Sequence, residues 1–209
     1  MRTSVQDPLV PANTRIVNRY NRETFIFTDP VEDEAFARFD VLLEKGGSGG
    51  GNAVAHIHPN SDEHFHIHKG RLLISIDGIE HIADAGETVM VPRGKPHFFR
   101  NAHDGDTHAT VSFTPGHKHL RFFINLAAMT VLEPKSFSPS GDVKLLQIAL
   151  ALNAYRDHLY IAGPPIWIQK LMYAALSPIA RLMGYRLIVG PTNNKLKFGE
   201  TLRLIEQAA

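Results

Sequence analysis

The sequence contains no cysteine. Disulfide bonds and thiolate metal sites are therefore excluded, so any metal must be bound by histidine and carboxylate side chains. A net charge is nearly absent as well, because 22 lysine and arginine residues are balanced by 21 aspartate and glutamate residues. This balance lacks the basic character of a nucleic-acid-binding protein, and we expect no nucleic-acid partner.

Long hydrophobic runs are also missing. The longest uncharged apolar runs, near residues 159–169 and 171–180, are about ten residues long, whereas a transmembrane helix needs about 20. The N-terminus carries no long apolar core after its first charges. We therefore expect a cytoplasmic protein without a transmembrane segment.

Histidine, in contrast, is plentiful, with 12 in 209 residues. His56 and His58 are two residues apart, so on a strand their side chains point to the same side and can bind one ion. Glu63 adds a carboxylate and His97 a third imidazole. Three neutral nitrogens and one anionic oxygen suit a divalent first-row metal, and they leave positions open for substrate, water or dioxygen.

Two sequence motifs surround these four residues. The first contains Gly50, His56, His58, Glu63 and Gly70. The second contains Gly86, Pro92, Gly94, His97 and Asn101. At every specified position and offset, the two motifs resemble those of the cupin superfamily, and the resemblance covers roughly residues 36–130.

The cupin resemblance implies a mainly β fold, a double-stranded β-helix that is similar to a jelly roll. It also implies one divalent transition metal, which would be Fe, Mn, Ni, Cu, Co or Zn. The implied ligands are His56, His58, Glu63 and His97.

Short apolar runs separated by glycines predict the strands of such a barrel. We expect strands near residues 24–28, 36–44, 53–58, 63–69, 72–77, 80–83, 88–91, 97–101 and 107–114. The expected organisation is an N-terminal arm at 1–35, the cupin barrel at 36–116 and a C-terminal helical extension at 117–209. The arm could lie along its own barrel or add to the sheet of a partner.

Side-chain alternation predicts the wall of a pocket. If Glu63 points toward the metal, other residues of the barrel strands point inward with it. The candidate wall residues are Phe65, Ile67, Phe99, Val111 and Phe113. Each could equally pack in the core, but together they favour a small, largely apolar or aromatic substrate.

The same alternation turns His64, His66 and His68 outward. We expect solvated or covered side chains at these positions rather than a second metal site. Asn101 is expected to hydrogen-bond to backbone atoms.

Helical spacing recurs after the barrel, near residues 120–127, 145–152, 166–183 and 200–207, with Pro178 expected to kink or restart the third helix. The apolar helix faces could cover the barrel or form a dimer interface. We expect the protein to be a homodimer. Contact with a membrane surface is an alternative, because Trp167 and Met172 accompany Lys170 and Arg181.

A narrower resemblance concerns the end of the barrel. Thr114, Pro115 and Gly116 precede a helix that carries Phe122 and Phe123, and this arrangement is similar to the quercetin dioxygenase-like cupins. It implies a metal-dependent dioxygenase acting on an enol or hydroxyl substrate.

In that reaction Glu63 would act both as a metal ligand and as a proton acceptor. Two alternatives remain at this stage. The same metal could serve a Lewis-acid isomerase or cyclase, or the protein could be a non-catalytic small-molecule-binding cupin.

Overall fold

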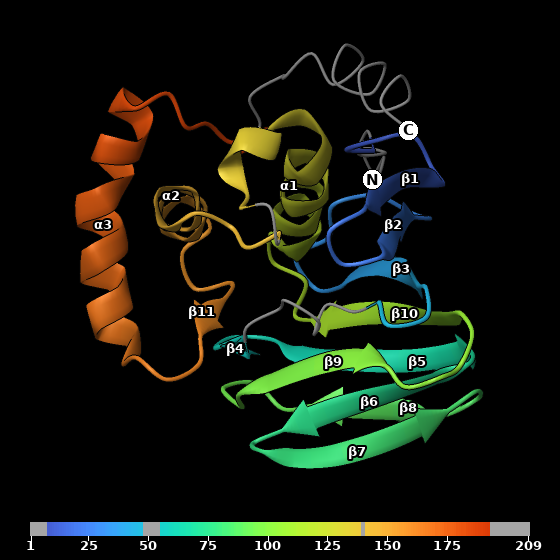
Figure 1. Cartoon of the computed structure of the whole chain (residues 1–209). Helices are drawn as coiled ribbons and strands as arrows, with labels where there is room; N and C mark the ends of the chain where they lie inside the picture. Colours follow the sequence, from blue (N-terminus) through green and yellow to red (C-terminus); the bar gives the residue numbers. More distant parts are fainter. Residues whose placement is uncertain (1–7, 48–54, 139–140, 193–209) are drawn as a thin grey trace, which may run out of the picture.

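The computed structural model describes residues 8–47, 55–138 and 141–192. Two antiparallel β-sheets form its main body, as Figure 1 shows. The larger sheet has the strand order β1-β2-β3-β10-β5-β8 and the smaller one β11-β4-β9-β6-β7. The strands are β1 Thr14–Asn18, β2 Glu23–Phe27, β3 Ala37–Leu43, β4 His56–Ile57, β5 Asp62–Lys69, β6 Arg71–Ile76, β7 Ile79–Asp84, β8 Thr88–Val91, β9 His97–Asn101, β10 Thr107–Thr114 and β11 Tyr160–Ile161.

The predicted class, a mainly β barrel with a C-terminal helical extension, is confirmed by these sheets and the helices that follow them. Strands β8, β9 and β10 have the predicted bounds, because period-two patterning and flanking glycines mark them clearly. The strand predicted at 53–58 is shorter, with β4 at His56–Ile57 and residues 53–54 outside the described part of the chain.

The N-terminal hairpin of β1 and β2 extends the chain's own larger sheet. Glu23 pairs with Leu43 of β3, so the arm lies along its own barrel. β1 is an element that the sequence analysis missed. Its two inward residues are Ile16 and the polar Asn18, which makes its alternation weak.

A cluster of aromatic rings joins this hairpin to the barrel and the first helix. The ring of Phe39 on β3 lies 5.7 Å from Phe25 and 4.6 Å from Phe123. All three rings belong to one apolar core. The hairpin is therefore part of the folded unit around the barrel.

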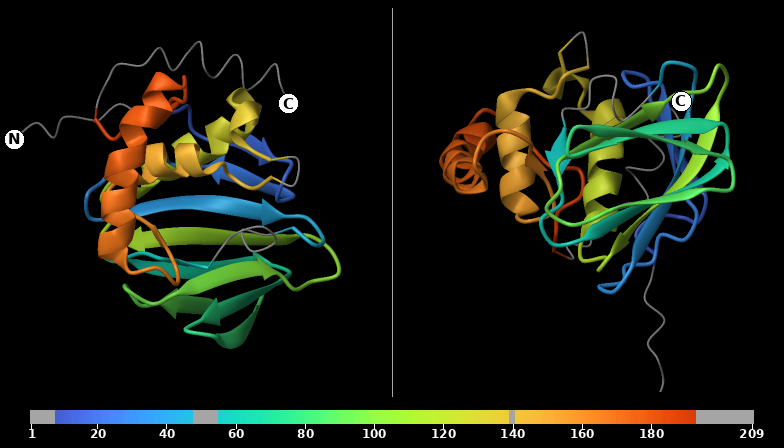
Figure 2. Two further views of the ribbon diagram at one scale, coloured as in Figure 1. Left: turned by 60° about the vertical axis from the view of Figure 1, so that its left-hand side comes forward. Right: turned by 90° about the horizontal axis from the view of Figure 1, so that it is seen from below.

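Three helices, α1 His119–Leu132, α2 Leu145–Ala154 and α3 Ile166–Leu182, follow the barrel, with a 3-10 turn at Pro134–Ser136. Both views in Figure 2 place α2 between α1 and α3. Pro178 lies inside α3, which continues to Leu182 as one helix. The helix expected at 200–207 lies outside the described residues.

One side of α3 packs inward and the other is exposed. Tyr173 is buried against α2 and its neighbours. In contrast, Trp167, Leu171 and Leu182 are 64%, 65% and 89% exposed. Within the described residues, no helix is both long and apolar enough to cross a membrane.

Asn101 hydrogen-bonds to backbone atoms, as predicted, and these bonds connect three segments of the chain. Its Nδ2 donates to the carbonyl oxygens of Leu43, Glu44 and Gly105 at 3.0, 2.9 and 2.8 Å. Its Oδ1 accepts from the Thr107 hydroxyl at 2.8 Å. The amide therefore fixes the end of β9 against the ends of β3 and β10.

The Asn101→Asp substitution tests this role. It would place carboxylate oxygens against three carbonyl groups that now receive hydrogen bonds. We expect the free energy of unfolding to fall by about 3 kcal/mol or more, measured by urea denaturation. Asn153→Asp, at a partly exposed site, is the matched control, and equal midpoints for the two variants would contradict the assignment.

Candidate metal centre

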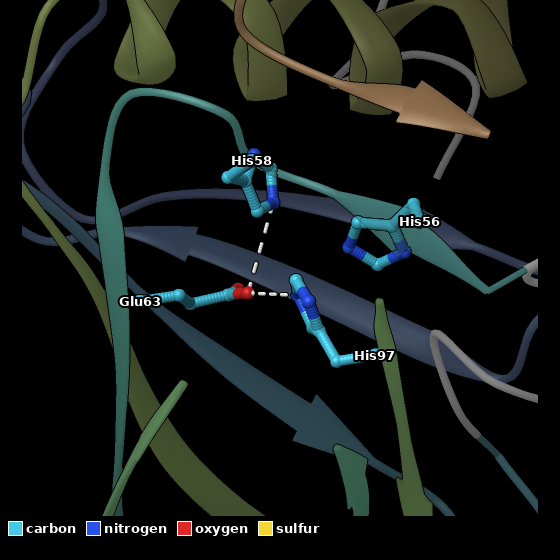
Figure 3. A group of neighbouring side chains, drawn as sticks. All are labelled: His56, His58, Glu63 and His97. Atoms are coloured by element: carbon cyan, nitrogen blue, oxygen red, sulfur yellow. Dashed lines mark hydrogen bonds and ion pairs between the residues drawn. The ribbon is translucent and has the colours of Figure 1, made fainter. Parts of the chain in front are cut away.

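Four side chains from both sheets converge on one point, as Figure 3 shows. Glu63 comes from β5 of the larger sheet, whereas His56 and His97 come from β4 and β9 of the smaller one, where they are direct cross-strand partners. His58 follows β4 immediately and completes the group. One ligand atom from each residue lies within 4.8 Å of all the others, so the group could hold a metal ion.

The Glu63 carboxylate is the meeting point of the cluster. Its Oε2 lies 2.6 Å from Nε2 of His97 and 3.6 Å from Nε2 of His58. Glu63, His58 and His97 are each only 2% exposed. Burial lowers the pKa of His97, but the Glu63 carboxylate and the Lys95 carbonyl together raise it overall.

The second nitrogen of each buried imidazole is held by a backbone carbonyl. Nδ1 of His58 lies 2.5 Å from the His158 oxygen, and Nδ1 of His97 lies 2.9 Å from the Lys95 oxygen. A carbonyl oxygen can only accept, so Nδ1 carries a proton in both rings. In a neutral ring this tautomer leaves the lone pair on Nε2, which would then be the metal-binding atom.

Nε2 of His58 has no hydrogen-bond partner within the described residues, although it is buried. A buried polar atom without a partner is costly. Burial, followed by the nearby His56, holds the pKa of His58 well below its usual value, so its ring is neutral and can donate a lone pair. The donor set and this orphaned nitrogen both fit a divalent first-row metal.

A further layer around His58 comes from the C-terminal extension. Nε2 of His119 lies 3.3 Å from Nδ1 of His58, and Nδ1 of His119 donates to the Gly116 oxygen at 3.0 Å. Burial lowers the pKa of His119 to about 3, which keeps it neutral. Sequence reasoning missed His119 and His158, because neither belongs to a ligand motif.

A cavity of about 260 Å³ borders the metal centre. His56 and Glu63 form part of its wall, and most of the remainder is apolar. It is lined by Asn18, Asn21, Glu23, Phe25, Phe39, Val41, His56, Glu63, Phe99, Val111, Phe122, Phe123, Asn125, Leu126, Met129, Thr130, Phe137, Gly141, Asp142, Val143, Ile148, Ala151, Leu152, Leu159 and Ile161.

The five candidate wall residues have different positions relative to this cavity. Phe99 and Val111 line it. Phe65, Ile67 and Phe113 are fully buried in the core instead. Phe65 packs on Phe99 with ring centroids 4.9 Å apart, and the ring of Phe113 stacks on His119 at 4.3 Å. Other side chains therefore cover these rings.

Glu23 is a buried acidic group in the cavity wall that sequence reasoning did not single out. It is 4% exposed, and burial raises its pKa to about 8, although a hydrogen bond from Asn18 acts in the opposite direction. The available signal was its alternation with Phe25 and Phe27 on the inward side of β2.

The outward-facing histidines of β5 contact neighbouring strands. His66 bonds the Thr88 hydroxyl at 2.9 Å, and His68 bonds the Thr110 hydroxyl at 2.7 Å. Sheet pairing also brings a carboxylate near them, because Asp40 lies opposite Thr110 and 3.1 Å from His108. Asp40, His68 and His108 thus form a second group with metal-binding atoms, of which His68 is exposed and the other two are partly buried.

Comparison with known proteins supports the fold. Residues 39–113 match the family model of the Cupin domain. With the antiparallel sheets described above, this match establishes a cupin β-barrel followed by C-terminal helices. No curated protein matches the chain.

Several solved structures are similar to part of the chain. Pac13 of Streptomyces, a nucleoside dehydratase, is 14% identical over 52% of this chain and 81% of its own, with a TM-score of 0.41. A cupin sugar phosphate isomerase from Silicibacter pomeroyi is 22% identical over 51% of this chain and 66% of its own, with a TM-score of 0.40. KdgF from Halomonas sp. is 16% identical over 44% of this chain and 76% of its own, with a TM-score of 0.35. These likenesses concern the fold alone.

Loss of His58 should remove the metal without unfolding the barrel. We expect His58→Ala to weaken metal binding by more than the roughly 10–100-fold that loss of an outer-shell partner costs. Elemental analysis after dialysis measures the effect, and circular dichroism checks the fold. His81→Ala, at an exposed position of β7, should retain wild-type metal content. Full metal content in His58→Ala would refute the ligand assignment.

Glu23 should make stability depend on pH. Its pKa rises from an ordinary 4.5 to about 8 on folding, so its contribution to stability is complete below pH 4.5 and is lost as the pH rises through 8. Between pH 4 and pH 7 the loss is on the order of 3 kcal/mol.

The Glu23→Gln variant lacks this ionisation and should gain stability relative to wild type over that interval. Urea denaturation at both pH values measures the gain. Glu80→Gln, at an exposed position, is the matched control. A constant difference between Glu23→Gln and wild type would show that the Glu23 carboxyl ionises normally.

Proposed function

We propose that this protein is a metal-dependent dioxygenase. Its substrate is a small, largely apolar or aromatic molecule that carries an acidic enol or hydroxyl group. One observation carries the proposal: a largely buried group of three imidazoles and one carboxylate borders a mostly apolar cavity, and His56 and Glu63 of this group form part of the cavity wall. A site designed only to bind an apolar molecule has no need for this donor set.

His56, His58, His97 and Glu63 would hold the ion. A divalent redox-capable metal bound there would lower the pKa of a substrate enol or hydroxyl and would supply the redox chemistry for its reaction with dioxygen. The buried carbonyl partners of His58 and His97 keep both Nε2 atoms directed at the centre. Preorganised ligands of this kind need no rearrangement when the substrate arrives.

Glu63 is the proposed proton acceptor. Its carboxylate already lies within hydrogen-bonding distance of the imidazole of His97. A carboxylate loosened from a cation can accept the enol proton at Oε2, whereas an imidazole whose lone pair is bound to an ion cannot.

The apolar walls position the rest of the substrate. Phe99 and Phe123 offer aromatic surface beside the metal centre, and Val111 adds aliphatic surface. These side chains exclude water from the reacting end, which strengthens electrostatic interactions there. An aromatic substrate fits such walls better than a sugar phosphate does, because the latter would bury a charge against apolar surface.

Elemental analysis combined with oxygen uptake tests this function. We expect a redox-capable metal in the purified protein and oxygen consumption when flavonols or 1,3-diketones are added. Metal without substrate-dependent oxygen uptake would reject the dioxygenase and favour a Lewis-acid isomerase or cyclase. Failure to bind metal even after reconstitution would favour a non-catalytic binding protein.

Glu63→Gln supplies a further arm of the same experiment. With excess metal present, its turnover should fall by roughly 100-fold or more, which is the usual contribution of a general base. Glu80→Gln should turn over at the wild-type rate. Unchanged turnover in Glu63→Gln would assign the proton to another group.

A further inference from the structure

The cavity has a second polar region, which comes from the N-terminal hairpin. Asn18, Asn21 and Glu23 line it together with the apolar residues. Asn18 and Glu23 are direct cross-strand partners at the end of the hairpin, and they are only 6% and 4% exposed. Two adjacent buried polar side chains therefore border a mostly apolar space.

Strand register places this polar region far from the metal centre. Glu63 pairs with Phe113 of β10. Glu23 pairs with Leu43 of β3, and Leu43 pairs with Thr107 at the other end of β10. These two positions lie six residues apart on β10, which corresponds to roughly 20 Å along an extended strand.

Helix α1 also borders the cavity, over roughly 10 Å of its length from Phe123 to Thr130. Phe123, in its first half, lies beside the metal centre, with its ring 6.5 Å from that of His58. Met129 and Thr130, in its last turn, also line the cavity. The cavity therefore extends from the metal centre to the hairpin, with a mostly apolar wall between polar groups at its two ends.

The hairpin end has unused hydrogen-bonding capacity. Oδ1 of Asn21 is buried and has no partner within the described residues. Burial keeps Glu23 protonated at neutral pH by raising its pKa to about 8, so it can both donate and accept. No lysine or arginine occurs among the described residues that line the cavity.

We propose that Glu23, with Asn18 and Asn21, forms a subsite for a neutral hydroxyl or carbonyl group at the far end of an elongated, mostly apolar substrate. This subsite selects substrates with polar groups at both ends and disfavours anionic ends, because no cation is available to neutralise them. The inference rests on the proposed function only in taking the metal centre as the reacting end. Binding at the hairpin end requires no turnover.

Two fragments of matched shape test the subsite. 4-Ethylphenol and 4-ethyltoluene differ by a hydroxyl in place of a methyl group, and NMR titration of the Zn²⁺-reconstituted full chain gives a Kd for each. In Glu23→Leu, we expect the ratio of the two affinities to move about tenfold toward 4-ethyltoluene. Glu23→Gln, which keeps a donor and an acceptor, and the exposed control Glu80→Leu should leave the ratio close to that of wild type.

A titration of His58→Ala identifies the end at which the phenol binds. If the hydroxyl binds at Glu23, His58→Ala should keep the wild-type ratio of the affinities for 4-ethylphenol and 4-ethyltoluene. The opposite result would overturn the subsite: a wild-type affinity ratio in Glu23→Leu and a changed ratio in His58→Ala. The hydroxyl would then bind at the metal centre.

A crystal of the wild-type protein soaked in 4-ethylphenol gives a test that does not depend on a variant folding. The phenol oxygen should lie within hydrogen-bonding distance of the Glu23 carboxyl group, and a phenol found elsewhere would overturn the subsite. Oxygen uptake separates this inference from the proposed function. Oxygen uptake by the wild-type protein together with an unchanged affinity ratio in Glu23→Leu rejects the subsite alone. A shifted affinity ratio in Glu23→Leu without oxygen uptake by the wild-type protein rejects the dioxygenase alone.

Discussion

A carboxylate buried among imidazoles is the interaction on which this structure depends. Glu63 is 2% exposed and its Oε2 lies 2.6 Å from Nε2 of His97. Removing a carboxylate from water costs several kcal/mol unless buried partners compensate it. His97 belongs to the opposite sheet, so the contact that offsets this desolvation cost forms only when the two sheets pack against each other. The fold and the candidate chemistry therefore depend on the same few contacts.

Segments outside the matched cupin region complete the site. The His158 carbonyl, which orients His58, precedes β11, and β11 pairs with β4 beside the metal centre. Phe123 of α1 and Glu23 of β2 both lie outside residues 39–113 and both line the cavity. A barrel alone would supply the four candidate ligands but only part of this cavity, so the added segments set the shape and polarity that a substrate meets.

The alternation of side chains along a strand correctly predicted which residues of β5 are buried. Alternation along β5 separates the buried Phe65 and Ile67 from the outward His66, because successive side chains of a strand point to opposite sides. The cupin resemblance, rather than local pattern, implied that His56 and His97 lie together, and the two are cross-strand partners. Alternation gives a direction only, so it could not tell that Phe113 would be covered by His119.

The features that the sequence did not reveal are those that depend on distant segments. Tyr160 pairs with Ile57, more than 100 residues earlier, and nothing local marks a strand of two residues. Glu23 similarly resembles an ordinary strand-end glutamate until Asn18 and α1 enclose it. Enclosure, rather than residue type, raises its pKa and makes its role distinct from that of an exposed glutamate.

The separation of the two polar ends has a consequence for specificity. An apolar wall discriminates weakly between molecules of similar size, since each additional methylene changes binding by only about 1–3 kcal/mol. Buried polar groups discriminate much more strongly, because a ligand that leaves them without partners incurs their full desolvation cost. With the candidate metal centre at one end and Glu23 at the other, the reacting group and the group that selects the substrate can be recognised independently. Binding contacts at Glu23 can then orient the substrate without perturbing the ligands of the metal.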